Sequence, residues 1–218
     1  MKSKYSNSAN CVFNSDANFS LKPAGSVAVH WLSDKPVYLT TKTTGVDQFA
    51  QIIEIAILDT DQSVLFHTQL MPNVAIDKDA ERLHGLNLSA LQGRPYWFEV
   101  VAKIQSIVKN RKVIIFNALF EMRLLQQTCQ AYNLPVNWID NLTVSCSMHL
   151  AANAYGVDNR YGTVSFEHAL SKAAIDGYHQ NSGTVTAAYA MVQMIRSVIR
   201  CAEQDNAESK RSTLQIAV

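Results

Sequence analysis

The chain has 218 residues, of which 48% are hydrophobic and 17% charged, and its formal net charge is +1. This composition is that of one folded domain of moderate size with an ample core, and it excludes a disordered chain. The near-neutral charge excludes a global basic field that would hold nucleic acid through counterion release, so any such binding must be local.

The two ends of the chain differ in composition from its middle. Residues 1–28 are rich in Ser and Asn, which predicts a loosely ordered segment, and residues 203–218 predict a polar, frayed tail. The folded domain is expected over residues 29–202. No apolar run approaches the roughly 18 residues of a membrane span, and the first residues lack the apolar stretch of a secretory signal. We therefore expect no membrane association and a cytoplasmic location.

The sequence of the first half of this domain predicts three strands followed by two helices. Asp61 and Gln62 belong to a turn between two apolar runs, which indicates a hairpin. Asp77 is the expected N-cap of a short helix, because its side chain can accept backbone donors of the first turn. The expected elements are strands at Val37–Thr41, Gln51–Asp59 and Ser63–Leu70, a helix beginning near Asp77, and an amphipathic helix at Tyr96–Lys109.

The second half alternates strands and helices. Asn117 follows a β-branched run and is placed to cap a helix, and Pro135 lies beyond the end of that helix. Together the elements predict an α/β fold, with a five-stranded mixed sheet flanked by helices. The expected elements are strands at Val113–Phe116 and Asn137–Asp140, and helices at Ala118–Tyr132, Val144–Tyr155, Val164–Ala174 and Thr184–Arg200.

Three segments in this order carry a specific pattern. Residues 40–45 read Thr-Thr-Lys-Thr-Thr-Gly, residues 117–121 read Asn-Ala-Leu-Phe-Glu, and His179 is followed five residues later by Thr184. These segments resemble the motifs Asp-Thr-Glu-Thr-Thr-Gly, Asn-Ala-x-Phe-Asp and His-x4-Asp of the DEDDh-type 3′-5′ exonucleases, the family of the DNA polymerase III epsilon subunit. Residues 51–56 and 83–86 are similar to the second strand and the His-Gly-Ile turn of that family. The resemblance implies a ribonuclease-H-like fold.

The catalytic residues that the resemblance implies are mostly replaced. The family's four acids fall on Thr40, Lys42, Glu121 and Thr184, and only the histidine, at His179, is unchanged. A pair of divalent metal ions needs several carboxylate ligands, whereas Lys42 and Glu121 together sum to zero charge. We therefore expect no intact catalytic set, vestigial roles for Glu121 and His179, and no metal, with Mg or Mn only where the site has been rebuilt.

Two expectations concern the geometry of this degenerate site. The Lys42 ammonium is predicted to reach into the emptied metal site and pair with Glu121, because either group would be costly to bury alone. His179 is predicted to be a partly exposed loop histidine, with no metal-bound water to deprotonate. The resemblance also implies a set of nucleic-acid-binding residues, which are Thr43, Thr44, Gly45, His84, Asn117 and Phe120.

Three function classes stay open. The first is a catalytically degenerate exonuclease-like protein that binds nucleic acid, such as a single-stranded DNA or RNA 3′ end, or a protein partner. The second is an active 3′-5′ exonuclease whose rebuilt site uses Glu121, His179 and further acids such as Glu54 or Asp176. The third is a purely protein-binding regulatory module. Relatives of the ribonuclease T type are dimers, so the resemblance also leaves a dimer open.

Overall fold

The structure, a computed structural model, describes residues 21–216 and is built around one five-stranded sheet. Strand β1 pairs antiparallel with β2 and parallel with β4, while β3 and β5 form the two edges. This mixed sheet confirms the predicted fold class. The strands are β1 (Val37–Thr43), β2 (Ile52–Leu58), β3 (Val64–Gln69), β4 (Lys112–Ile115) and β5 (Thr143–Cys146).

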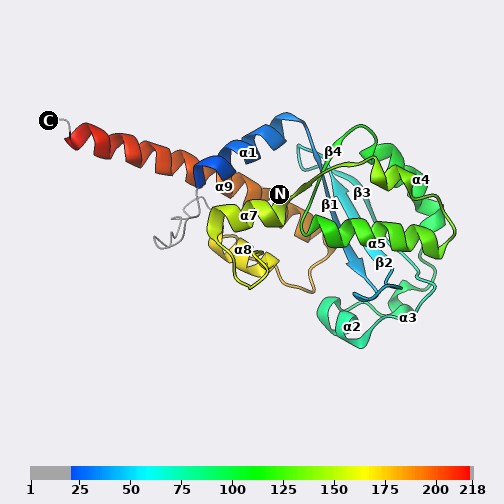
Figure 1. Cartoon of the computed structure of the whole chain (residues 1–218). Coiled ribbons are helices and arrows are strands. Elements are labelled where there is room, and N and C mark those ends of the chain that lie inside the picture. Colours follow the sequence, from blue (N-terminus) through cyan, green and yellow to red (C-terminus); the bar gives the residue numbers. More distant parts are fainter. Residues whose placement is uncertain (1–20, 217–218) are drawn as a thin grey trace.

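Helices cover both faces of the sheet (Figure 1). Helices α4 and α5 pack on one face, where Trp97 and Leu124 lie in a buried core. Helices α1, α7, α8 and α9 pack on the other face, where Met191 and Ile195 are buried. The helices are α1 (Leu21–Ser33), α2 (Lys78–His84), α3 (Leu88–Leu91), α4 (Trp97–Val108), α5 (Ala118–Ala131), α6 (Asn137–Asp140), α7 (Ser147–Tyr155), α8 (Phe166–Lys172) and α9 (Thr184–Ile216).

The central strand β1 contributes alternate residues to the two cores. Val37 and Leu39 belong to the core on the α4 and α5 face, whereas Tyr38 belongs to the core on the α9 face. Successive side chains of a strand point to opposite faces. The alternation therefore directs Thr40 and Lys42 toward the α9 face, and directs Thr41 toward α5.

The predicted fifth strand is wrong, and the predicted helix Val144–Tyr155 begins later, as α7 at Ser147. Asn137–Asp140 forms the short helix α6 and not the fifth strand, and Val144 lies in the true fifth strand and not in a helix. Thr143–Cys146 pairs in parallel with β4, and this tertiary pairing outweighs the weak local signal of so short a segment. Asp77 does cap α2, since its side chain accepts a hydrogen bond from the Asp79 backbone N–H at 2.8 Å.

The two ends of the domain are helical over residues for which loose structure was expected. Residues 21–28 of the predicted N-terminal segment lie in α1, and the remainder of that segment is outside the described residues. Helix α1 packs closely on α9, because a Cβ atom added to Gly25 would lie 2.3 Å from the Ala202 Cβ. Helix α9 continues beyond the predicted end at Arg200 to Ile216 and projects from the body (Figure 1). Within residues 21–216, no helix is long and apolar enough to cross a membrane.

Candidate functional site

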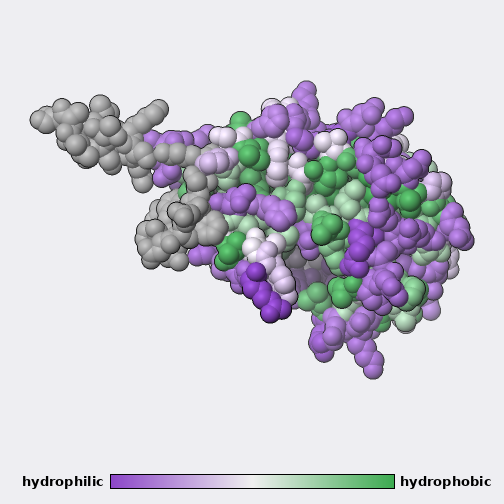
Figure 2. Space-filling model, viewed as in Figure 1, coloured by the Kyte–Doolittle hydropathy of each residue, from purple (hydrophilic) through white to green (hydrophobic). Residues whose placement is uncertain are grey.

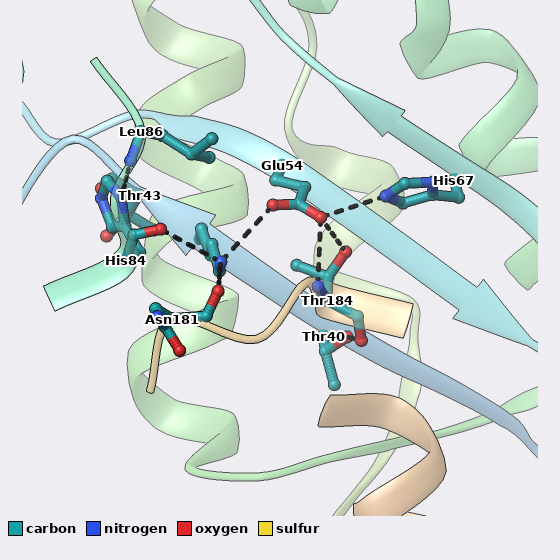
Figure 3. A network of polar contacts seen from close by, with 9 residues as sticks. Thr40, Thr43, Glu54, His67, His84, Leu86, Asn181 and Thr184 are labelled. Carbon is teal, nitrogen blue, oxygen red and sulfur yellow. Dashed lines mark hydrogen bonds and ion pairs between the residues drawn. The ribbon is translucent and has the colours of Figure 1, made fainter. Parts of the chain in front are cut away.

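The candidate site lies at the end of β1, where the start of α9 meets the sheet (Figure 3). The Thr40 hydroxyl donates a hydrogen bond to the Thr184 carbonyl oxygen at 2.7 Å. Thr184 is the first residue of α9 and is buried. The structure therefore brings together Thr40, Lys42 and Thr184, three of the positions at which the resembled family has acids.

A carboxylate that the motifs do not include, Glu54, is the centre of this site. Glu54 lies opposite Lys42 in the β1–β2 register, and its side chain is only 4% exposed. Its Oε1 accepts hydrogen bonds from the Thr184 backbone N–H at 3.1 Å and from the Thr184 hydroxyl at 3.0 Å. The His67 Nε2 lies 3.0 Å from the same oxygen. Glu54 thus places a negative charge at the N-terminus of α9, where the helix dipole stabilises it.

The surroundings of Glu54 favour its ionised form. Burial alone raises the pKa of this carboxyl group, but the hydrogen bonds from His67 and Thr184 and the charge of Lys42 lower the pKa below its usual value. Both carboxylate oxygens are engaged, since Oε2 lies 3.7 Å from the Lys42 Nζ. The charge and both acceptor oxygens of Glu54 are therefore already used in contacts with other groups of the protein.

The Lys42 side chain is held by oxygen atoms from three segments. Besides Glu54, its Nζ lies 3.5 Å from the His84 carbonyl oxygen and 3.4 Å from the Asn181 carbonyl oxygen. Burial lowers the pKa of Lys42, while the neighbouring Glu54 opposes this shift. The predicted pair between Lys42 and Glu121 is wrong, because Glu54 is the acidic partner of Lys42.

Glu121 lies on the other side of β1, in the first turn of α5. Its Oε2 accepts a hydrogen bond from the Thr41 hydroxyl at 2.6 Å. Burial raises the pKa of Glu121 to about 7, and the Thr41 hydrogen bond only partly opposes this shift. Thr41 and Lys42 are adjacent and point to opposite faces of the strand, so Glu121 and Lys42 cannot meet.

The side chains at this site do not fit a two-metal centre. Thr40 and Thr184 supply neutral hydroxyls, Lys42 supplies a cation, and the oxygens of Glu54 are already engaged. In the described part of the chain, no three His, Cys, Asp or Glu side chains are grouped so that they could hold a metal ion. Asp176, a further acid considered for a rebuilt site, is exposed on the loop before α9.

The residues predicted to contact nucleic acid differ in how far they are buried. His84 is buried, and its Nδ1 accepts a hydrogen bond from the Leu86 N–H at 3.1 Å, so the neutral ring donates from Nε2 to the Thr43 carbonyl oxygen. Burial lowers the pKa of His84, which favours this neutral form. Thr44 is buried and accepts a hydrogen bond from the Gln51 N–H at 2.9 Å. His84 and Thr44 therefore shape this end of β1 from within, and neither offers a free surface.

Apolar side chains that the motif analysis did not single out are exposed beside the site. Val46 is 73%, Phe49 67% and Leu119 86% exposed. Val46 and Phe49 lie in the loop after β1, and Leu119 lies in the first turn of α5. The Arg123 side chain joins these two segments, donating to the Val46 carbonyl oxygen at 3.1 Å. Figure 2 shows a hollow in the face of the molecule that is drawn there, with hydrophobic residues along part of its rim.

The remaining predicted residues lie around this region. Asn117 is in a left-handed conformation (φ 56°) and makes no side-chain cap bond, which corrects its expected role as a hydrogen-bonding cap. Phe120 is half-buried beneath the guanidinium of Arg123, which lies 5.3 Å from its ring centroid. Gly45 is buried, and its carbonyl oxygen accepts a hydrogen bond from the Thr43 hydroxyl at 2.8 Å. His179 is exposed on the loop before α9, as predicted, and only its backbone is hydrogen-bonded, to Ser182.

Comparisons with known proteins place this site in context. No family model matches the chain. The chain is 27% identical over 153 residues to "Uncharacterized exonuclease CP81" of Escherichia phage 186, covering 69% of this chain and 79% of the relative. It is 27% identical over 131 residues to the DNA polymerase III subunit epsilon of Pasteurella multocida, covering 56% of this chain and 52% of that protein. The chain thus spans about half the length of this epsilon subunit.

The fold is also that of solved nucleases. The structure matches the nuclease domain of 3′hExo, described as a DEDDh family member bound to rAMP, with a TM-score of 0.57 and 14% identity. The match covers 75% of this chain and 90% of that domain. At this identity the likeness concerns the fold alone.

Proposed function

The chain belongs to the DEDDh-type 3′-5′ exonuclease family, and from this premise we propose that it is a catalytically degenerate member that binds nucleic-acid ends without metal-dependent hydrolysis. The observation that carries the proposal is the position of the Lys42 ammonium, ion-paired with Glu54 beside Thr40 and Thr184. A cation of the protein occupies the place from which the family's acids are missing.

Electrostatics oppose a metal ion at this place. A divalent ion about 4 Å from the Lys42 ammonium would be repelled by ~8 kcal/mol at an effective dielectric constant of roughly 20. Glu54 offsets only one positive charge and already neutralises Lys42. Glu121 faces the other side of the strand with Thr41, and burial disfavours its charged form. The remaining acids therefore do not supply the charge that a two-metal mechanism needs.

The exposed apolar residues support retained binding. Val46, Phe49 and Leu119 offer three apolar side chains to solvent from two segments that Arg123 holds together. Nucleobases have apolar faces that gain free energy when they pack on such side chains. Because the net charge is only +1, the proposed binding depends on these contacts more than on phosphate attraction, and it should change little with salt.

Two other functions stay predictions. An active exonuclease with a rebuilt, Mg- or Mn-dependent site would need Glu54 to leave Lys42, His67 and Thr184 when metal binds. A protein-binding module would use the same exposed apolar residues for a protein partner and would show no affinity for nucleic acid. A dimer and a cytoplasmic location also stay predictions.

The proposal is tested by binding a fluorescent single-stranded oligonucleotide with a free 3′ end in the presence of EDTA. We expect binding without shortening, and we expect Leu119→Ser to weaken the binding about fivefold, which corresponds to ~1 kcal/mol of lost apolar contact. Phe98→Ser is the matched control, because Phe98 is 51% exposed and packs on Tyr132 beyond the far end of α5.

The outcomes separate the three functions. Binding that Leu119→Ser weakens and Phe98→Ser does not would support the proposal. Absence of binding by the wild-type protein would favour the protein-binding module. Shortening of the oligonucleotide after addition of Mn²⁺ would contradict the proposal and favour a rebuilt active site.

A further inference from the structure

The Lys42 ammonium lies among three oxygen atoms that belong to three different segments. Figure 3 labels the residues that supply them, Glu54, His84 and Asn181. The three atoms are the Glu54 Oε2 on β2 at 3.7 Å, the His84 carbonyl oxygen at the end of α2 at 3.5 Å, and the Asn181 carbonyl oxygen at 3.4 Å. The Lys42 side chain is 11% exposed, so water supplies little of its solvation. An ammonium group has three N–H donors, and the protein offers it three acceptors.

We propose that these three oxygens form a site for a monovalent cation, that the Lys42 side chain is its resident cation, and that this cation holds the loop before α9 against the end of α2. The charges agree with this assignment. One carboxylate and two neutral carbonyl oxygens carry a net charge of −1, which a single ammonium neutralises and a divalent ion would exceed.

The distances indicate attraction by charge rather than short directional hydrogen bonds. All three exceed the 2.7–3.2 Å that is usual for N–H···O bonds. A site of this kind recognises a positive charge of about the right size and does not depend on one fixed geometry. A small ammonium ion supplied in solution should therefore be able to replace the lysine side chain.

The loop before α9 is also anchored on either side of its middle. Tyr178 packs edge-on against Phe166 at a centroid distance of 5.0 Å, and Thr184 is bound to Glu54. Between them, His179 and Asn181 are exposed. The contact from the Lys42 Nζ to the Asn181 carbonyl oxygen is thus the tie from β1 to this part of the loop. This inference does not rest on nucleic-acid binding, because it concerns only contacts within the chain.

The test is chemical rescue of Lys42→Ala, with hydrogen exchange of the amides of residues 177–183 and thermal melting as readouts. We expect the exchange of these amides to rise at least tenfold, and the melting temperature to fall by roughly 5–10 °C, because a buried carboxylate loses its partner. Propylammonium chloride should restore most of the protection. Equal concentrations of tetramethylammonium chloride control for ionic strength and should not restore protection, because its methyl groups keep the charge farther from the three oxygen atoms.

A second pair of variants separates a cation site from a simple ion pair. In Lys42→Met with Glu54→Gln, both charges are absent while the side-chain sizes are nearly kept. A simple ion pair predicts that this double variant regains the loop protection lost in Lys42→Met. The cation site predicts that exchange stays fast, because the His84 and Asn181 carbonyl oxygens still lack a cation.

Two results would contradict the proposed cation site. Unchanged exchange of residues 177–183 in a folded Lys42→Ala protein would overturn the proposal, as would a propylammonium effect no larger than that of tetramethylammonium chloride. If Lys42→Ala does not fold, Lys42→Met serves instead because it keeps most of the side-chain volume. Its loop exchange must then rise above that of the wild type, and an unchanged rate would overturn the proposal.

Discussion

Glu54 and Glu121 lie on opposite faces of the sheet, and their surroundings give the two carboxyl groups opposite properties. Glu54 is held by His67, by the first residue of α9 and by Lys42, and its pKa is lowered. The Glu121 carboxyl group accepts a hydrogen bond from the Thr41 hydroxyl, and burial raises its pKa to about 7. Similar side chains beside one strand thus differ in ionisation because Glu54 has a cationic partner and several hydrogen-bond donors, whereas the described contacts give the Glu121 carboxyl group only the Thr41 hydroxyl.

The acid at the family's motif position, Glu121, lacks a cationic partner, while the acid outside the motifs, Glu54, organises the region. An internal ion pair between Lys42 and Glu54 joins β1 and β2 at this site.

The largest expected effect is on stability. Glu54→Gln should lower the free energy of unfolding by roughly 3–5 kcal/mol at pH 7, because it leaves the buried Lys42 ammonium without its counter-charge. Glu121→Gln should leave it unchanged or raise it, since a neutral side chain suits that half-buried position. Urea unfolding of both variants measures this contrast. Equal losses in the two variants would show that the environments do not differ as described.

The second effect is the pH dependence of stability, and its direction differs between the two groups. The folded-state pKa of Glu121 is raised from 4.5 to about 7, so the folded state binds the proton more tightly. Its contribution to stability is therefore complete below pH 4.5 and is lost as the pH rises through about 7, by ~2–3 kcal/mol. Unfolding curves should show this loss in the wild type and not in Glu121→Gln.

For Glu54 the same reasoning gives the opposite direction. Its folded-state pKa lies below the ordinary value of 4.5. Its contribution is therefore present above pH 4.5 and is lost as the pH falls through the lowered folded-state pKa. The wild type should lose stability relative to Glu54→Gln only in this acidic range. A Glu54-dependent loss between pH 6 and 8 would contradict the assignment.

A smaller effect is expected from His67, whose side chain is 41% exposed. His67→Ala removes one hydrogen bond to Glu54 and should lower the free energy of unfolding by ~1 kcal/mol at pH 7. It should also raise the pKa of Glu54, so that acid destabilisation begins at a higher pH. Urea unfolding at pH 7 and at pH 4 measures both consequences. His30→Ala, at an exposed position on α1, is the control and should change neither.

The smallest effect is expected from Thr41→Val, which removes the hydroxyl that donates to Glu121. Loss of one hydrogen bond should lower the free energy of unfolding by roughly 0.5–1.5 kcal/mol at pH 8, where Glu121 is ionised. At pH 5 the protonated carboxyl group needs this donor less, and the loss should be smaller. A loss that is the same at both values of pH would indicate that Thr41 acts through packing alone.

Much of the fold could be predicted from the sequence, because buried strands and amphipathic helices have local signatures. The runs at Val37–Thr41 and Val113–Phe116 predicted β1 and β4 to within a few residues. The fifth strand could not be located, since Thr143–Cys146 is short and is defined by its pairing with β4. The full length of α9 was also missed, because the polar residues beyond Arg200 carry no apolar stripe like that of the preceding turns.

The candidate site could be predicted only in part. Motif order identified Thr40, Lys42 and Thr184, which the structure does bring together. The partner of Lys42 was assigned wrongly because it depends on strand register and on the face to which each side chain points. Glu54 lies opposite Lys42 in the hairpin of β1 and β2, so pairing these two strands in sequence would have revealed the ion pair. The exposure of Leu119 depends on how α5 packs against the rest of the domain, and no local sequence pattern predicts it.

The most direct test of the account is a calorimetric titration of the wild-type protein with Mn²⁺, in the presence and absence of a short single strand with a free 3′ end. A gel assay of the same samples would record any shortening of the strand. We predict no heat of Mn²⁺ binding and no shortening, because Lys42 and Glu54 already neutralise each other. Mn²⁺ binding accompanied by removal of 3′ nucleotides would contradict the account and establish the protein as an active exonuclease.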